Sequence, residues 1–193
     1  MIRIATEADV PEILAIYAPY VTDTTITFEY DVPTLEEFYT RFRKITEQFP
    51  WLVWEEKGGI QGYAYACLPF ERSAYRWCAE PSIYLKPSAR GQGIGRKLYL
   101  ALEEILKELG YQVLLALVTG ENAASVRFHE KLGYEIAGEL KNTGYKMGRW
   151  CGVFWMEKQV NFVDNPMEFP TFWNQVGGNE QKIDDILYKL SLS

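Results

Sequence analysis

The stretch SIYLKPSARGQGIGRKLYLALEEILKELG, residues 82–110, decides the fold of this chain of 193 residues. It begins with the apolar and β-branched residues of a strand, and a glycine-rich turn then runs from Arg90 to Gly95. Four apolar residues follow at the spacing of one helix face: Leu98, Leu102, Ile105 and Leu109. Gly110 marks the end of this helix, so the local order is strand, glycine turn, helix.

The glycine turn predicts a site for an anion. Gly91, Gly93 and Gly95 carry no side chains, so successive backbone N–H groups can converge on one ligand. The helix that follows adds the positive end of its dipole, and a diphosphate suits this arrangement. For the spacing taken alone, a glycine-rich loop that binds nothing is an equal alternative.

Two other phosphate-binding motifs fit the turn poorly. A P-loop needs Gly-Lys followed by Ser or Thr, whereas Gly95 is followed by Arg96 and Lys97. A dinucleotide-binding fingerprint would place its third glycine at the position of Arg96. Nucleotide hydrolysis and NAD chemistry are therefore disfavoured.

On both sides of this segment, strands alternate with helices. The strands are predicted at residues 2–4, 51–56, 60–68, 76–85, 113–118, 134–140 and 152–158. Capping boxes at Thr6 with Asp9 and at Thr34 with Glu37 predict two helices ahead of the glycine turn. A short helix is predicted to start at Asn122 and to end at Gly133. The pattern indicates one α/β domain over residues 1–160.

The amino-acid composition of the sequence changes after Val160. Residues 161–178 are rich in Pro, Phe, Trp and Gly, and an amphipathic segment starts at Asn179. We interpret residues 161–193 as a C-terminal extension with an amphipathic helix. Its aromatic side chains are expected to pack onto the body or onto a second subunit.

Composition argues against several classes of protein. Acidic residues outnumber basic ones by 26 to 20, and the net charge of −6 argues against a nucleic-acid surface. Neither a signal peptide nor a membrane span is recognisable, so a cytoplasmic location is expected. Cys67, Cys78 and Cys151 lack the spacing of a disulfide framework or a zinc site, and we expect reduced thiols in the core.

Several separated motifs resemble one enzyme family. SIYLKP at 82–87, RGQGIGRKL at 90–98 and ENAASVRFHEKLGYEIAG at 121–138 resemble the acyl-CoA-binding core of GNAT N-acetyltransferases. TTITFEY at 24–30, RSAYRWCAEPSIYL at 72–85 and GYKMGRWCGVFWM at 144–156 resemble the phosphinothricin and methionine sulfoximine acetyltransferase branch. This resemblance spans about residues 1–158. It implies a central mixed sheet flanked by helices that opens into a V, acetyl-CoA as co-substrate, no metal, and a homodimer.

The resemblance also implies roles on the cofactor side. Seven residues of the turn would surround the diphosphate: Arg90, Gly91, Gln92, Gly93, Ile94, Gly95 and Arg96. The backbone of Ile83 and Leu85 would bind the thioester oxygen and the pantetheine amides, with Asn122 on the pantetheine arm. His129 would assist the departing thiolate. On the residues alone, Asn122 is a plain N-cap, a role that is compatible with the pantetheine contact, and His129 is equally a surface or capped histidine.

On the acceptor side, Glu80 is the residue that the resemblance implies as the base for the amine. Partial burial would raise its pKa, while the alternative is a solvated carboxylate at a strand end. Five positions match those that line the amino-acid pocket: Phe28, Glu29, Arg72, Tyr75 and Ser82. Arg72 could hold a carboxylate or phosphinate through its planar fork, or it could be a solvated loop cation. Lys146 and Arg149 remain unplaced.

The expected reaction is direct transfer of acetyl from acetyl-CoA to the primary amine of a small amino acid or analogue, of the phosphinothricin, methionine sulfoximine or sulfone type. No covalent acyl-enzyme is expected, since Cys78 lies near Glu80 in the sequence but nothing else marks it as a nucleophile. Two alternatives stay open. The acceptor could be a polyamine, an aminoglycoside or a protein N-terminus, or the chain could be a non-catalytic acyl-CoA-binding module.

Overall fold

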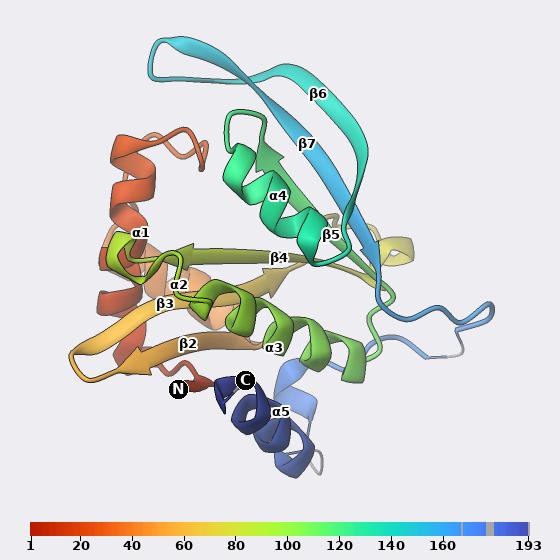
Figure 1. Cartoon of the computed structure of the whole chain (residues 1–193). Helices are drawn as coiled ribbons and strands as arrows, with labels where there is room; N and C mark the ends of the chain where they lie inside the picture. The colour runs from red at the N-terminus through yellow and green to blue at the C-terminus, as the bar shows by residue number, and fades with distance from the viewer. Residues whose placement is uncertain (167, 177–179, 193) are drawn as a thin grey trace.

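The computed structural model describes residues 1–166, 168–176 and 180–192, in which seven strands form one mixed sheet (Figure 1). The strands are β1 Ile2–Ile4, β2 Trp51–Glu56, β3 Gly59–Cys67, β4 Cys78–Leu85, β5 Val113–Thr119, β6 Glu135–Lys146 and β7 Arg149–Gln159. They are ordered β1-β2-β3-β4-β5-β7-β6, and β4–β5 is the one parallel pair in this sheet. The predicted α/β fold is confirmed.

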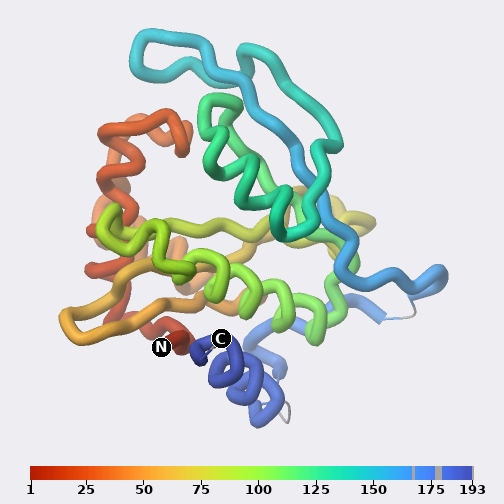
Figure 2. The backbone as a smooth tube through the Cα atoms, in the orientation of Figure 1, coloured from red at the N-terminus to blue at the C-terminus, as the bar shows by residue number. Residues whose placement is uncertain are grey.

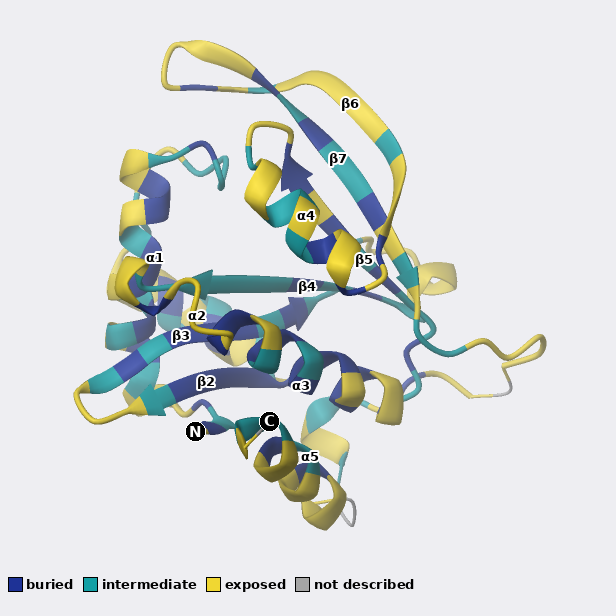
Figure 3. Cartoon of the chain, in the orientation of Figure 1, coloured by how far each residue is buried: buried dark blue, intermediate teal, exposed yellow. Residues whose placement is uncertain are grey.

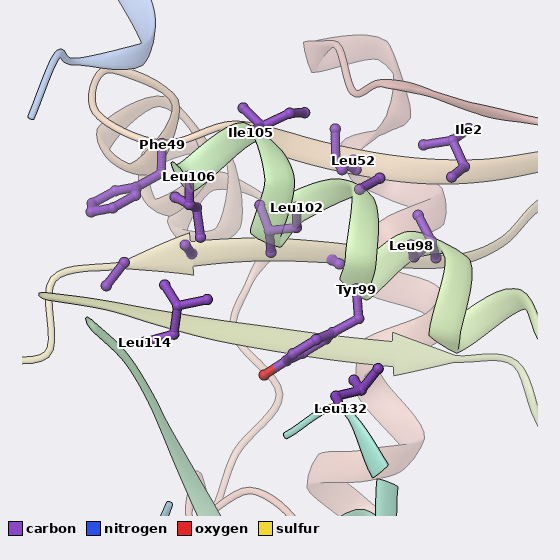
Figure 4. Close-up of a cluster of buried hydrophobic side chains, with 14 of the residues drawn as sticks. Ile2, Phe49, Leu52, Leu98, Tyr99, Leu102, Ile105, Leu106, Leu114 and Leu132 are labelled. Carbon is purple, nitrogen blue, oxygen red and sulfur yellow. The ribbon is translucent and has the colours of Figure 1, made fainter. Parts of the chain in front are cut away.

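Helices cover both faces of the sheet. They are α1 Val10–Asp23, α2 Leu35–Thr46, α3 Ile94–Glu108, α4 Ala123–Lys131 and α5 Glu180–Leu192. On one face, α1 and α2 bury Ile13 and Phe38 against Trp51. On the other face, α3 buries its predicted apolar stripe, and Figure 4 shows Leu102 lying between the helix and the strands. The sheet therefore separates two hydrophobic cores.

The two predicted capping boxes behave differently. Thr34 caps α2 as expected, because its hydroxyl accepts from the backbone N–H of Glu37, whose carboxylate accepts from Thr34 in return. The box of Thr6 and Asp9 opens a 3₁₀ turn, Glu7–Asp9, and α1 begins only at Val10. A 3₁₀ turn is a common start to an α-helix, and the box satisfies the same free N–H groups in either geometry.

The parallel strands β4 and β5 pair over only two positions and then diverge. Cys78 lies beside Val113 and Ala79 beside Leu114, and no further pair follows. Lys86 donates its backbone N–H to Gln61 of the β3 side, so the odd-numbered residues of β4 direct theirs toward β5. Pro81 has no N–H to donate at the next odd position, which ends the ladder. The sheet opens into the expected V at this point.

The hairpin of β6 and β7 is longer than predicted and curves over α4 (Figure 2). The polar run after Leu140 reads as a loop in the sequence, yet β6 continues to Lys146. A register shift between Leu140 and Gly144 and a positive φ of 51° at Asn142 absorb the extra residues. The turn itself uses Met147 and Gly148, at φ 52° and 76°.

The C-terminal segment packs onto the body. In α5, Ile183 and Leu187 are buried against the core under α3, and the backbone N–H of Ile2 donates to the Ser191 hydroxyl at 2.8 Å. Figure 1 shows the two ends of the chain close together. The predicted start of this helix at Asn179 lies outside the described residues.

The thiol prediction holds for one cysteine of three. All are free, but only Cys151 is buried, while Cys67 and Cys78 are partly exposed because they lie where loops leave the sheet. Among the described residues, no group of three or more His, Cys, Asp or Glu side chains is placed to hold a metal ion. In that same part of the chain, no helix is long and apolar enough to cross a membrane.

Candidate active site

The glycine turn presents a row of free backbone N–H groups. Gly91 and Gly93 have φ values of 75° and 81°, which L side chains rarely adopt, and Gly93 caps α3. The first intrahelical bond at this end runs from Lys97 N to Gly93 O at 3.1 Å. Among the described residues, the N–H groups of residues 91–96 have no hydrogen-bond partner. These donors, at the positive end of a 15-residue helix, suit a diphosphate.

A cavity of about 480 Å³ lies between this turn, the diverging strands β4 and β5, and α4. Its lining includes most of the predicted cofactor residues: Ile83, Leu85, Arg90, Gly91, Gly93, Gly95, Arg96 and Asn122. Gln92 does not reach it, since its side chain is exposed and donates to Ser88 O at 2.6 Å. Ile94 is instead buried in the core. The position, outside the carboxyl ends of two parallel strands, is typical of ligand sites in α/β sheets.

Backbone groups of β4 line this cavity, and those of Leu85 already have a hydrogen-bond partner. Tyr20 of α1 accepts from Leu85 N at 3.1 Å and donates to Leu85 O at 2.6 Å. Arg90 donates to the same hydroxyl at 3.0 Å. Ile83 lies beyond the last β4–β5 pair, so its N–H faces the opening without a strand partner. Ile83 therefore offers a backbone donor to a ligand, whereas Leu85 and Tyr20 form one unit.

Asn122 and His129 enter the cavity from α4. The side-chain oxygen Oδ1 of Asn122 accepts from Ser125 N at 3.1 Å, so Asn122 is the N-cap of α4, and it also lines the cavity. His129 is only 4% exposed. Its Nδ1 is 2.8 Å from Ser125 O, which can only accept, so Nδ1 carries the proton. Its Nε2 then accepts from the Tyr99 hydroxyl at 2.8 Å.

These contacts fix the protonation of His129. Burial lowers the pKa of His129 below 6.5, and the bond to Ser125 opposes this only in part. The imidazole is therefore neutral at pH 7, with both nitrogens engaged. His129 lines the cavity, and Tyr99 is its hydrogen-bond partner at Nε2.

The neutral state of His129 predicts a pH-dependent stability. A buried group with a lowered pKa binds its proton only in the unfolded chain between the two pKa values, so stability falls as pH drops through 6.5. We expect the unfolding free energy of wild type to exceed that of His129→Gln at pH 8, and this difference to shrink by pH 5. Urea titrations at both values measure it, and a difference that grows on acidification contradicts the assignment.

Glu80 lies on the other face of β4. Ala79, Ile83 and Leu85 pack toward α3, so the alternating positions Glu80 and Ser82 face the side of α1 and α2. Burial raises the pKa of the Glu80 carboxyl. Glu80 does not line the cavity, but Ser82 does, one side-chain repeat or about 7 Å along the strand. Glu80 therefore lies one side-chain repeat away from the cavity lining, on the face of β4 opposite α3.

Beyond Glu80, no helix among the described residues covers this face of the sheet. Leu117 of β5 and Trp155 of β7 are register partners on this face, and Leu117 is 43% exposed despite its central strand. The Phe70 ring stacks on Trp155 at 5.7 Å and contacts Tyr75 at 4.6 Å. This open sheet face, formed by Glu80, Ser82, Leu117 and Trp155, therefore includes Tyr75 at its rim.

The remaining predicted acceptor residues lie at two edges and not in the cavity. Arg72 is exposed next to the 3₁₀ turn Ser73–Tyr75, and it has no ion-pair partner among the described residues. Phe28 packs its ring against the backbone of Gly144. Glu29 pairs with Arg41 of α2 at 2.6 Å, and its second oxygen is buried without a partner among the described residues.

The two basic residues left unplaced by the sequence have structural partners. Lys146 is buried and donates to Thr27 O at 2.7 Å, and burial lowers its pKa. This bond ties the hairpin of β6 and β7 to the loop that carries Phe28. Arg149 is exposed and forms an ion pair with Glu121. Neither side chain lines the cavity.

Comparison with known proteins decides the family. Residues 2–155 match the family described as "Acetyltransferase (GNAT) domain". This chain belongs to the GNAT acetyltransferases. The chain is 38% identical over 168 residues to phosphinothricin N-acetyltransferase of Alcaligenes faecalis, covering 86% of this chain and 85% of that protein. It is 37% identical to L-methionine sulfoximine/L-methionine sulfone acetyltransferase of Pseudomonas aeruginosa, covering 83% and 94%.

Solved GNAT structures agree with this assignment. The phosphinothricin acetyltransferase of Sinorhizobium meliloti in complex with AcCoA has a TM-score of 0.82 at 35% identity, covering 91% of this chain and 96% of that one. The resemblance predicted from the motifs is confirmed. The chain is an acetyl-CoA-dependent N-acetyltransferase, with acetyl-CoA as its co-substrate.

Two residues of this GNAT site were not predicted from the sequence. Tyr20 and Tyr99 lie on the apolar faces of α1 and α3, where a tyrosine is typical of the core. Their hydroxyls bind Leu85 and His129, which are 65 and 30 residues away in the chain. No local pattern encodes such contacts.

Proposed function

We propose that this enzyme transfers acetyl from acetyl-CoA directly to the primary amine of a small amino acid or analogue of the phosphinothricin, methionine sulfoximine or methionine sulfone type. The arrangement of β4 carries the proposal. Its backbone lines the cavity beside the free N–H groups of residues 91–96, and Glu80 projects from the opposite face toward the open sheet face. Acetyl donor and amine can thus approach one thioester carbon from two sides.

The residues divide the reaction between them. Residues 91–96 would hold the diphosphate, and Asn122 the pantetheine arm. The N–H of Ile83 would donate to the thioester oxygen as negative charge develops there. Glu80 would take the proton that the ammonium has to lose before its nitrogen attacks. The C–S bond then breaks, the amine nitrogen loses a second proton as the amide forms, and the departing thiolate would gain that proton, with His129 in the cavity wall assisting the transfer.

Acceptor recognition would use the rim of the open sheet face. Arg72 has an unpaired guanidinium that suits a carboxylate or phosphinate, and Tyr75 supplies an aromatic wall. Ser82 connects this rim with the cavity. Phe28 and Glu29 would close the pocket from the loop after α1. The charged head of a small amino acid matches this set better than a long polyamine, which offers no anion to Arg72.

The test is CoA-thiol release from acetyl-CoA with a panel of amines. The panel contains phosphinothricin, methionine sulfoximine, methionine sulfone, common amino acids, spermidine, an aminoglycoside and a peptide with a free N-terminus. Turnover confined to the first three and related amino acids supports the proposal. Turnover with spermidine, the aminoglycoside or the peptide would contradict the proposed acceptor class and point to that amine instead. Acetyl-CoA binding without any turnover would indicate a non-catalytic module.

We also propose that the enzyme is a cytoplasmic homodimer. Three free thiols are compatible with a reducing compartment. The hairpin of β6 and β7 exposes large apolar side chains: Leu140, Tyr145 and Trp150. Figure 3 shows exposed residues along β6 toward the tip of the hairpin. A second copy would shield this surface from water.

Sedimentation equilibrium is expected to give twice the chain mass of 22.3 kDa. Trp150 is 61% exposed, and its ring contacts Tyr145 at 5.3 Å. A charge at its position would oppose burial in an interface, so Trp150→Glu is expected to shift the mass toward one chain. Tyr188→Glu in α5 serves as a control at an equally exposed aromatic on another surface. A monomeric wild type would overturn the homodimer.

A further inference from the structure

The segment after β7 lies outside the residues that match the GNAT family and is fixed to the body by backbone bonds. Val160 N donates to Gln112 O at 3.0 Å, near the start of β5. Farther along, Thr171 N donates to Leu109 O at 2.9 Å and Trp173 N to Gln48 O at 3.1 Å. Figures 1 and 2 show the described parts of this segment returning past the end of α3. The segment is therefore held in one place on the molecule.

From there it contacts the loop that joins β3 to β4. Trp77 donates its indole N–H to Glu168 O at 3.3 Å, and its ring lies 4.8 Å from that of Phe169. The Arg76 guanidinium lies 5.0 Å over the same Phe169 ring. Phe169 is 52% exposed, so its ring is not part of the core. Its ring interacts with the last two residues of the loop.

The same loop has a second aromatic contact at its other end. Phe70 stacks on Trp155 of β7 and contacts Tyr75. Arg72 and Tyr75, the proposed acceptor residues, lie between the two contacts. Behind the loop lies a cavity of about 360 Å³, lined by Leu68 and Glu71 on the loop side and by Tyr111 and the C-terminal segment on the other. Because close packing does not support the loop from behind, its position depends on the contacts at its ends.

We infer that Phe169 is a positioning residue for the amine site. It fixes the Arg76–Trp77 end of the loop that presents Arg72 and Tyr75, so the C-terminal segment sets the affinity of this acetyltransferase for its amine. The ring does not touch the cavity for acetyl-CoA. This inference rests on the acceptor role proposed for Arg72.

The experiment compares four full-length variants with wild type, using acetyl-CoA and the best amine of the panel. Phe169→Ala is expected to raise KM for the amine about tenfold, the scale expected when an aromatic pair and a cation–π interaction are removed together. KM for acetyl-CoA and kcat at saturating amine should stay within about twofold of wild type, since the ring lies away from the cofactor cavity. Phe169→Tyr keeps the ring and should restore the wild-type KM. Phe162→Ala is the matched control, since Phe162 is a 66% exposed aromatic of the same segment without a ring contact among the described residues.

Arg72→Ala separates this inference from the function on which it depends. If Arg72→Ala raises KM for the amine while Phe169→Ala does not, the acceptor site stands and the role of Phe169 is overturned. If Arg72→Ala leaves that KM unchanged, the acceptor assignment itself fails. An equal rise in Phe162→Ala, or a parallel rise of KM for acetyl-CoA in Phe169→Ala, would indicate a general structural effect and would also overturn the inference.

Discussion

Glu80→Gln is expected to lower kcat by about 10²- to 10⁴-fold, the range that one general base contributes, and to leave the affinity for acetyl-CoA nearly unchanged. Glutamine keeps the shape of the side chain but cannot accept the proton of the ammonium. Glu80 does not line the cavity, so the proposed contacts to the diphosphate and the pantetheine arm should remain. The measurement combines steady-state kinetics with calorimetric titration of acetyl-CoA.

The pH dependence gives a second, independent readout of Glu80. Because burial raises the pKa of Glu80, its carboxylate becomes protonated at a higher pH than that of an exposed glutamate. Once protonated, it cannot act as the base. The kcat/KM of wild type should decrease at pH values below the pKa of Glu80. In Glu80→Gln this decrease on the acid side should be absent. A raised carboxylate pKa also means that stability is lost as pH rises through the folded value, so Glu80→Gln should not melt below wild type at pH 8. Unchanged turnover in a folded variant would remove Glu80 as the base.

The fold follows from patterns that are local in the chain. The strand, turn and helix of residues 82–110 each have their own periodicity, and the apolar stripe of α3 occupies the core that this periodicity predicts. The hairpin of β6 and β7 does not follow from such a local pattern, because its turn uses Met147 at a positive φ. A methionine there carries no turn signal of the kind that glycine or asparagine gives.

The two halves of the site differ in how far the sequence predicts them. The anion site is built from contiguous backbone groups, so its residues could be named from the glycine spacing and the resemblance together. The proposed acceptor side would combine Glu80, Arg72 and Phe28 from three separate segments, and their arrangement depends on tertiary contacts such as Phe28 on Gly144. The Tyr99 partner of His129 belongs to the same class of contact. These contacts cannot be predicted from a single sequence.

Gly93→Ala is expected to raise Kd for acetyl-CoA by about 10- to 100-fold. A left-handed conformation costs an L residue about 1–2 kcal/mol, and the loss of a charge-assisted hydrogen bond to the diphosphate costs a similar amount. Space is not the cause, because a Cβ at Gly93 would meet no atom within 4 Å. The weaker binding would come from the backbone: the turn can keep φ at 81° under strain, or relax and turn its N–H groups away from the ligand.

Gly148→Ala separates these two contributions. Gly148 has nearly the same φ, 76°, and equally open space, but it lies in the turn between β6 and β7. Both variants should lose similar unfolding free energy, because the backbone strain is the same. Only Gly93→Ala should weaken acetyl-CoA binding, since the turn that contains Gly93 lines the cavity and the turn that contains Gly148 does not. A folded Gly93→Ala that binds acetyl-CoA as tightly as wild type would show that the left-handed turn does not hold the diphosphate, and the binding energy would then have to come from Ile83, Asn122 and the walls of the cavity.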